Sequence, residues 1–137
     1  MVDIESIKPK IRELAEKYGV SLIVLFGSQV KGKTHKESDF DIAYYSEKKL
    51  DFNEEIKLDS NLTDVFRSNE VQLINLKKAS PLLAREITRD CIILFERKDN
   101  IFNDLLIYTI RMYDEARSLF RLRAQYVADR ITKYQYA

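Results

Sequence analysis

The sequence lacks several features that define large classes of protein. Among 137 residues it has one cysteine, Cys91, which excludes an intramolecular disulfide and a cysteine-based zinc site. Its only histidine, His35, cannot form a histidine-based metal cluster alone. No apolar run approaches the roughly 20 residues that span a bilayer, and the N-terminal stretch MVDIESIKPK has no signal-peptide core. We therefore expect a cytoplasmic protein that does not enter a membrane.

The chain also lacks an excess of charge of either sign. It has 23 basic and 22 acidic residues and a net charge of +1, so no overall field favours nucleic acid or an acidic membrane. No repeat, low-complexity tract or linker is present. With 45% hydrophobic and 33% charged residues, the chain is long enough for a real core. We expect one α/β domain over residues 1–137 that does not bind nucleic acid directly.

The first elements follow from apolar spacing and from glycine. Residues Ile4 to Tyr18 carry apolar side chains at helical intervals, and Gly19 stands where a helix stop is expected. Because a proline favours the first turn of a helix, we predict that this helix begins at about Pro9 or slightly before, after an extended start. The apolar, β-prone run from Ser21 to Phe26 predicts a strand.

Later segments alternate between helical and strand patterns. Ser80 is a good N-cap and Pro81 suits a first helical turn. Free cysteine packs as a small hydrophobe, so we expect Cys91 to be buried. The predicted elements are a mostly helical segment over 51–68, a strand over 71–76, a short helix over 80–89 and a strand over 91–95.

The last third of the chain predicts one long amphipathic helix, about 100–134, with no glycine or proline inside it. Such a helix is longer than a small sheet needs for cover. Its apolar stripe therefore has two interpretations: it covers the chain's own core, or part of it meets a partner. Tyrosine and arginine, which are enriched at interface hot spots, are numerous here.

Two carboxylates, Asp39 and Asp41, precede the β-prone run Ile42 to Tyr45. Alternate residues of a strand share a face, so these two side chains project together. Two such anions repel unless a cation lies between them, and carboxylate oxygens suit Mg²⁺. The alternative is a pair of solvated aspartates at the start of a strand.

The segment before these carboxylates offers groups that suit a phosphate. Gly27 and Ser28 end the first strand, and free N–H groups with a serine hydroxyl bind phosphate oxygens if a helix follows; a simple turn is the alternative. Lys31, Lys33 and Lys36 either attract a triphosphate or are merely solvated, and His35 either touches nucleotide or faces solvent.

The joint pattern is more specific than its parts. Gly27-Ser28, ten residues, and then Asp39-x-Asp41 resembles the signature of the nucleotidyltransferase superfamily that includes DNA polymerase β. GSQVKGKTHKESDFDIA, VQLINLKKASPLLAREITRDCIILFE and the long C-terminal helix resemble the minimal nucleotidyltransferase (MNT) antitoxins of HEPN/MNT toxin–antitoxin modules. The resemblance implies a polymerase β-like α/β fold, with a small mixed sheet flanked by helices.

The resemblance also implies a function, that of an antitoxin in a type VII-like module. Members of this kind are associated with transfer of AMP from ATP to a tyrosine of a HEPN-domain ribonuclease toxin. By this resemblance Asp39 and Asp41 would be catalytic and hold Mg²⁺, whereas Gly27, Ser28 and Lys33 would hold the triphosphate of ATP.

One residue departs from the superfamily pattern. A third carboxylate usually lies on a following strand, and the matching position is Gln72, whose amide is no useful general base. Glu70 lies two residues earlier and would share its face if the strand extends that far. The alternative function is therefore a non-catalytic antitoxin that neutralises the toxin by stoichiometric binding. Transfer to a small molecule or an RNA end is a third option.

Overall fold

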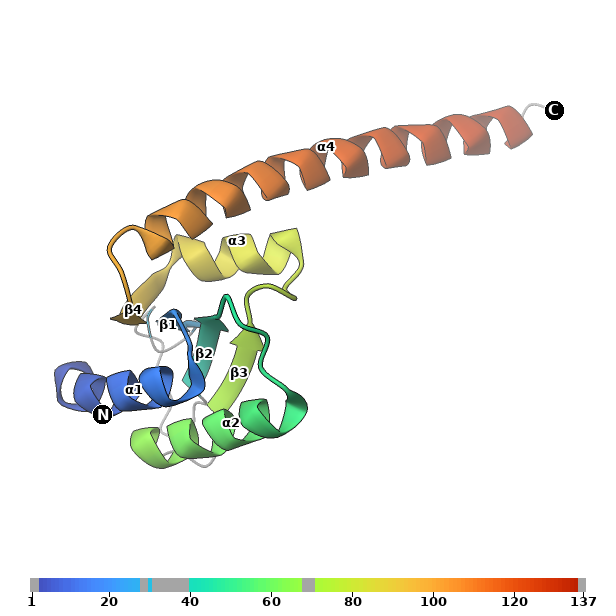
Figure 1. The fold of residues 1–137 in the computed structure, drawn as a ribbon. Helices are drawn as coiled ribbons and strands as arrows, with labels where there is room; N and C mark the ends of the chain where they lie inside the picture. Colours follow the sequence, from blue (N-terminus) through green and yellow to red (C-terminus); the bar gives the residue numbers. More distant parts are fainter. Residues whose placement is uncertain (1–2, 28–29, 31–39, 68–70, 136–137) are drawn as a thin grey trace.

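The computed structural model describes residues 3–27, 30, 40–67 and 71–135, which form four helices and four strands (Figure 1). Apart from the start of the first helix, each element begins and ends close to where the sequence pattern predicts it. In chain order the elements are α1 (Ile4–Tyr18), β1 (Leu22–Phe26), β2 (Phe40–Tyr45), α2 (Phe52–Phe66), β3 (Val71–Asn75), α3 (Pro81–Arg89), β4 (Cys91–Glu96) and α4 (Ile101–Gln135).

The four strands form one mixed sheet in the order β3-β2-β1-β4. β1 is antiparallel to both of its neighbours, whereas β2 and β3 are parallel and are connected through α2. The register pairs Phe26 with Asp41 across β1 and β2, and Asp41 with Gln72 across β2 and β3. The end of β1 and the starts of β2 and β3 therefore meet at one end of the sheet.

Helices cover both faces of the sheet, which makes three layers (Figure 1). α1 and α2 lie on one face, where Ile11 and Leu58 pack with Ile42 of β2. α3 and the first turns of α4 lie on the other face, where Ile87 packs with Val24 and Ala43. Successive strand residues divide between these two clusters, as the alternation of side chains requires. The predicted mixed sheet flanked by helices is confirmed.

The predicted start of the first helix was wrong. α1 begins at Ile4, and Pro9 lies inside it. The Asp3 side chain caps the helix by accepting a hydrogen bond from the backbone N–H of Glu5, at 3.1 Å. Ile7 is buried in the core, so the turn before the proline has both a cap and a packed side chain. These contacts offset the one helical hydrogen bond that Pro9 cannot donate.

Local signals predicted the other elements well. Ser80 caps α3 by accepting a hydrogen bond from the Leu83 N–H at 3.2 Å, and Pro81 occupies the first turn. Cys91 is half-buried rather than fully buried. Burial, and then the charge of Asp90, raises the pKa of its thiol to about 11, so the unreactive thiol form dominates at neutral pH.

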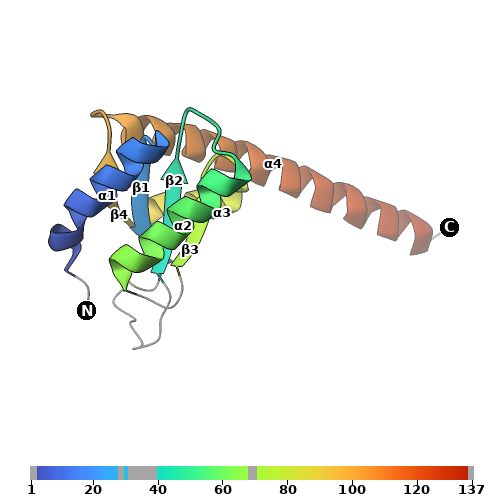
Figure 2. The same cartoon turned by 60° about the horizontal axis from the view of Figure 1, so that its bottom comes forward.

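The long C-terminal helix is confirmed as α4, which extends far past the rest of the molecule (Figures 1 and 2). Its start is fixed by Glu96 at the end of β4, whose carboxylate accepts a hydrogen bond from the Phe102 N–H at 2.8 Å. Its first turns pack on α3, but every side chain described from Arg117 onward is exposed. Within the described ranges, no helix combines the length and the apolar character that crossing a membrane requires.

Tyr44 in β2 gives a pH-dependent test of the sheet. It is 1% exposed, and burial, together with the charge of Glu55, raises the pKa of its hydroxyl from 10.0 to about 12. As the pH rises, the unfolded chain therefore loses this proton at a lower pH than the folded chain does. The contribution of the Tyr44 hydroxyl to the free energy of unfolding is intact below pH 10 and is lost as the pH rises to 12. Tyr44→Phe should lessen the alkaline loss of unfolding free energy by about 1 kcal/mol at pH 11.

Urea unfolding at pH 8 and pH 11 measures this difference. Tyr108→Phe, which removes the hydroxyl of a tyrosine that is 61% exposed, is the matched control and should keep the wild-type pH dependence. An equal alkaline loss in wild type and Tyr44→Phe would contradict the assignment.

Candidate functional site

Gly27 and Asp41 meet at the end of the sheet where β1 stops and β2 starts. Gly27 has φ +84°, a conformation that side-chain-bearing residues rarely adopt. A Cβ added to it would lie 3.1 Å from Cγ and 3.3 Å from Cβ of Asp41, and would collide with the carboxylate. The backbone after β1 and the Asp41 carboxylate can approach this closely only because residue 27 is glycine.

Asp41 projects from the sheet face opposite to that of Phe40. The Phe40 ring lies 4.7 Å from that of Phe66, between centroids, so it faces α2. Strand alternation then places Asp41 on the face that α3 and α4 cover. Its partner in the parallel register, Gln72, lies on the same face of β3 and is exposed. A half-buried carboxylate and an exposed amide are therefore neighbours at this edge.

Three predicted site residues, Ser28, Lys33 and Asp39, lie outside the described residues, and so do the other loop residues weighed above and Glu70. Of the predicted set, the structure brings together Gly27 and Asp41, with Gln72 beside them. The roles predicted for all five residues, Gly27, Ser28, Lys33, Asp39 and Asp41, stay predictions.

The donors in place suit a hard cation. The Asp41 carboxylate and the Gln72 side-chain amide offer oxygen ligands of the kind that Mg²⁺ accepts, and the missing Cβ of Gly27 avoids a collision with that carboxylate. Among the described residues no three histidine, cysteine or acidic side chains gather into a metal cluster. Any Mg²⁺ here would need Asp39, as the sequence predicts, or oxygens of the substrate.

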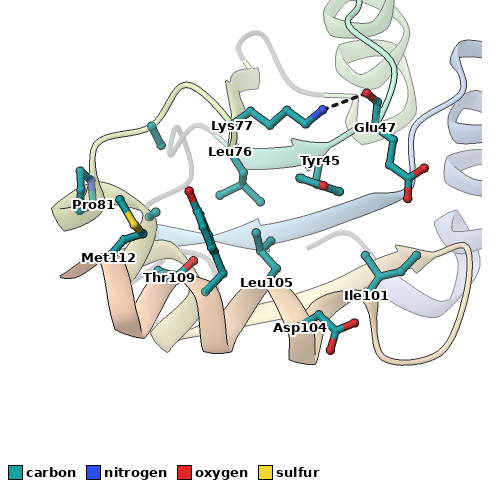
Figure 3. A pocket seen from close by; sticks show the side chains of 13 residues that line it. Tyr45, Glu47, Leu76, Lys77, Pro81, Ile101, Asp104, Leu105, Thr109 and Met112 are labelled. Carbon is teal, nitrogen blue, oxygen red and sulfur yellow. Dashed lines mark hydrogen bonds between the residues drawn. The ribbon is translucent and has the colours of Figure 1, made fainter. Parts of the chain in front are cut away.

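A separate cavity of about 580 Å³ lies on the same sheet face, where β2 ends at Tyr45 (Figure 3). Four residues of strand, about 13 Å, separate Tyr45 from Asp41. Lys77 donates a hydrogen bond to the Glu47 carbonyl at 2.9 Å, and its Nζ lies 5.3 Å from the centre of the Tyr45 ring. Leu105 and other α4 side chains form the opposite wall.

Sequence reasoning missed this cavity. Its walls come from the loop after β3, the end of β2, the start of α3 and α4, which are far apart along the chain. No motif or spacing marks Tyr45 and Lys77 as neighbours, because the pairing of β2 with β3 brings them together. The wall formed by Lys77 and Tyr45 and the opposite wall formed by α4 meet only because the chain packs this way.

Comparison with known families assigns the fold. The family model "Polymerase beta, Nucleotidyltransferase" matches residues 9–100, more than half of the chain. The match spans the β1–β2 segment with Gly27 and Asp41 as well as β3 with Gln72. The protein belongs to this nucleotidyltransferase family. The comparison with curated protein sequences found no match.

Solved structures place the chain more narrowly, beside MNT antitoxins. A toxin–antitoxin crystal structure with AMP-PNP is 27% identical, with a TM-score of 0.72, and the match covers 91% of this chain and 98% of that one. The MNT antitoxin in complex with the tri-AMPylated HEPN toxin of Shewanella oneidensis has the same fold, at 23% identity and a TM-score of 0.70 over 95% and 99% of the two chains. The resemblance to MNT antitoxins predicted from the sequence is confirmed.

Gly27→Ala tests the close approach to Asp41. The substitution should cost about 1–3 kcal/mol of unfolding free energy through backbone strain, and it should also displace the carboxylate. With Mg²⁺ and AMP-PNP added, we expect a rise in melting temperature for the wild type and the loss of most of that rise for Gly27→Ala.

Gly19→Ala is the matched control. Gly19 has φ +69°, but an added Cβ would meet only Lys48 Cδ, at 4.0 Å. This variant should share the strain and keep the ligand-dependent rise in melting temperature. An equal loss of that rise in both variants would show that strain, not the Asp41 contact, is responsible.

Proposed function

We propose that this protein is an antitoxin that transfers AMP from ATP to a tyrosine hydroxyl of a HEPN-domain ribonuclease toxin, in a Mg²⁺-dependent reaction in the cytoplasm. The observation that carries the proposal is the contact of Gly27 with the Asp41 carboxylate at the start of β2, in a chain of the polymerase β nucleotidyltransferase family. The similar toxin–antitoxin structure that holds AMP-PNP supports ATP as the substrate. The AMPylated toxin in another similar complex supports the acceptor.

The proposed site residues have two different roles. Asp39 and Asp41 would hold Mg²⁺, and Gly27 and Ser28, with Lys33, would hold the triphosphate. Bound Mg²⁺ would offset negative charge on the transferring phosphoryl group and on the leaving pyrophosphate. The protein's own contribution is to fix the α-phosphate opposite the incoming hydroxyl.

The reaction must also dispose of one proton. The tyrosine oxygen bonds to the α-phosphorus, the bond from that phosphorus to the bridging oxygen breaks, and pyrophosphate leaves. Gln72, beside Asp41, cannot take the proton from the hydroxyl. A tyrosine has a pKa of about 10, so its proton can pass to water or to a partner side chain. Transfer should therefore speed up as the pH rises towards 10.

The second candidate is a non-catalytic antitoxin that neutralises the toxin by stoichiometric binding. Gln72 favours it, because the neighbour of Asp41 in the sheet is an amide. The two candidates differ in one respect that an assay can measure, which is whether neutralisation requires the carboxylates.

The Asp39→Asn/Asp41→Asn double variant decides between these candidates. With ATP labelled at the α-phosphate and the HEPN toxin, the double variant should lose label transfer by at least about a hundredfold and should no longer suppress the toxin's ribonuclease activity. Asp99→Asn is the matched control and should act as wild type. Asp99 is an exposed carboxylate that follows the end of β4 farther from Asp41. Full suppression by the double variant without label transfer would establish the stoichiometric antitoxin instead.

Gln72→Glu tests the missing base. A carboxylate here is adjacent to Asp41 and can accept the tyrosine proton, so transfer near pH 7 should rise at least about tenfold and become less dependent on pH. Gln72→Ala, which adds no base, should not accelerate transfer. If Gln72→Glu is no faster than wild type from pH 6 to pH 9, proton removal does not limit the reaction.

A further inference from the structure

The part of α4 that extends past the body carries an apolar repeat with no cover in the described chain. Residues 117–135, about 28 Å of helix at 1.5 Å per residue, have exposed side chains throughout their described part. Phe120 is 65% exposed and Val127 is 47% exposed. A helix without tertiary contacts is marginal in water, because packing of an apolar face supplies most helix stability. This overhang therefore suits a partner that covers it.

Paired large side chains recur every seven residues along α4. The doublets Leu105/Leu106 and Met112/Tyr113 are half-buried at the body, whereas Leu119/Phe120 and Tyr126/Val127 are exposed on the overhang. A seven-residue spacing returns to nearly the same side of a helix. The line of side chains that packs α4 on its own body therefore continues, unchanged in type, along the overhang.

The cavity of Figure 3 lies beside the half-buried doublets, near the start of α4. Leu105 and Met112, one from each half-buried doublet, line it, and Tyr108 lies between them in the sequence. A recess of about 580 Å³ with polar and apolar lining thus opens beside the half-buried doublets, one heptad before the first exposed doublet. A partner that covers the overhang can extend a side chain into this recess.

Charge identifies the kind of partner. The overhang has five basic residues and one acidic residue, Asp129, although the whole chain has a net charge of only +1. Arg123 and Arg130 follow Thr109 and Ala116 at seven-residue spacing, so these four residues lie on one side of α4. On that side Thr109 is buried and Ala116 is half-buried. Arginines on this side need carboxylates opposite them when they are covered.

Arg130 is already oriented for such a contact. Its guanidinium donates to the Tyr126 hydroxyl at 3.1 Å and to the Tyr134 hydroxyl at 3.3 Å. The guanidinium carbon lies 5.6 Å and 5.8 Å from the centres of the same two rings. Two hydroxyls use only part of its donor set, and the remaining N–H groups suit a carboxylate.

We propose that the overhang of α4 docks in an apolar groove of the HEPN toxin that is lined by carboxylates, with the doublets in the groove and with Arg123 and Arg130 on its acidic groups. The identity of the partner rests on the proposed function. A second copy of this chain fits less well, since paired overhangs would set these arginines against each other with only Asp129 per copy to offset them.

Matched variants test the docking. Phe120→Ala and Leu122→Ala each shorten a side chain that is 65% or 64% exposed, but only Phe120 belongs to a doublet. Arg130→Glu and Arg121→Glu make the same charge reversal nine residues apart, on opposite sides of the helix. Titration calorimetry with the HEPN toxin should show at least about tenfold weaker binding for Phe120→Ala and Arg130→Glu, and less than about threefold change for the other two.

Three outcomes would overturn the inference. The first is that the wild type does not bind the toxin, or that Phe120→Ala and Arg130→Glu bind it as tightly as the wild type does. The second is a dimer of the free protein, detected by sedimentation, that Phe120→Ala dissociates. The third is binding of a labelled single-stranded RNA that Arg121→Glu and Arg130→Glu weaken equally while toxin binding persists.

The same complexes separate this inference from the proposed reaction. If the wild type binds the toxin through the doublets but transfers no label, the docking stands and AMP transfer is excluded. If label is transferred while Phe120→Ala and Arg130→Glu bind as wild type does, the reaction stands and the docking is excluded. The Asp39→Asn/Asp41→Asn variant should keep wild-type affinity for the toxin in either case.

Discussion

The close approach of Gly27 to the Asp41 carboxylate is the constraint on which the candidate site depends. It requires β1 to end at Phe26, in register with Asp41, and it requires a residue without a side chain directly after the strand. Buried apolar side chains on both faces fix that register, because a slip of one residue would exchange the two faces of β2. The core thus positions the carboxylate, and the glycine lets the backbone after β1 lie against it without a collision.

The two sheet faces contribute differently to function. α1 and α2 cover one face with a mainly apolar layer, which anchors β2 and β3, the strands that carry Asp41 and Gln72. The other face combines three features: the carboxylate at one end, the cavity at the other, and α4 across it. Glu96 at the end of β4 caps the first turn of α4, and α3 packs on the turns near the body, so both elements hold the part of α4 from which the overhang extends.

Local physics explains which parts of this structure the sequence could predict. Apolar periodicity and the Ser80 cap are properties of neighbouring residues, so strands and most helix limits were predicted closely. The start of α1 was not, because the Asp3 cap and the burial of Ile7 outweigh the preference of Pro9 for a first turn. The Asp41–Gln72 register and the cavity depend on pairing between strands distant in the chain, and sequence patterns carry little information about such contacts.

Separation of the site from the overhang bears on how one small chain can both bind and modify a partner. If one surface both bound the partner and placed the reacting groups, each contact would have to serve both purposes. Here the carboxylate end of the sheet and the apolar doublets lie on different elements, joined by the buried cluster between the sheet, α3 and the start of α4. If the proposed docking holds, a partner along α4 would gain its affinity from Phe120 and its neighbours, and the amide at Gln72 would slow the proposed transfer without weakening the complex. Long residence on the helix would then compensate for a slow transfer step.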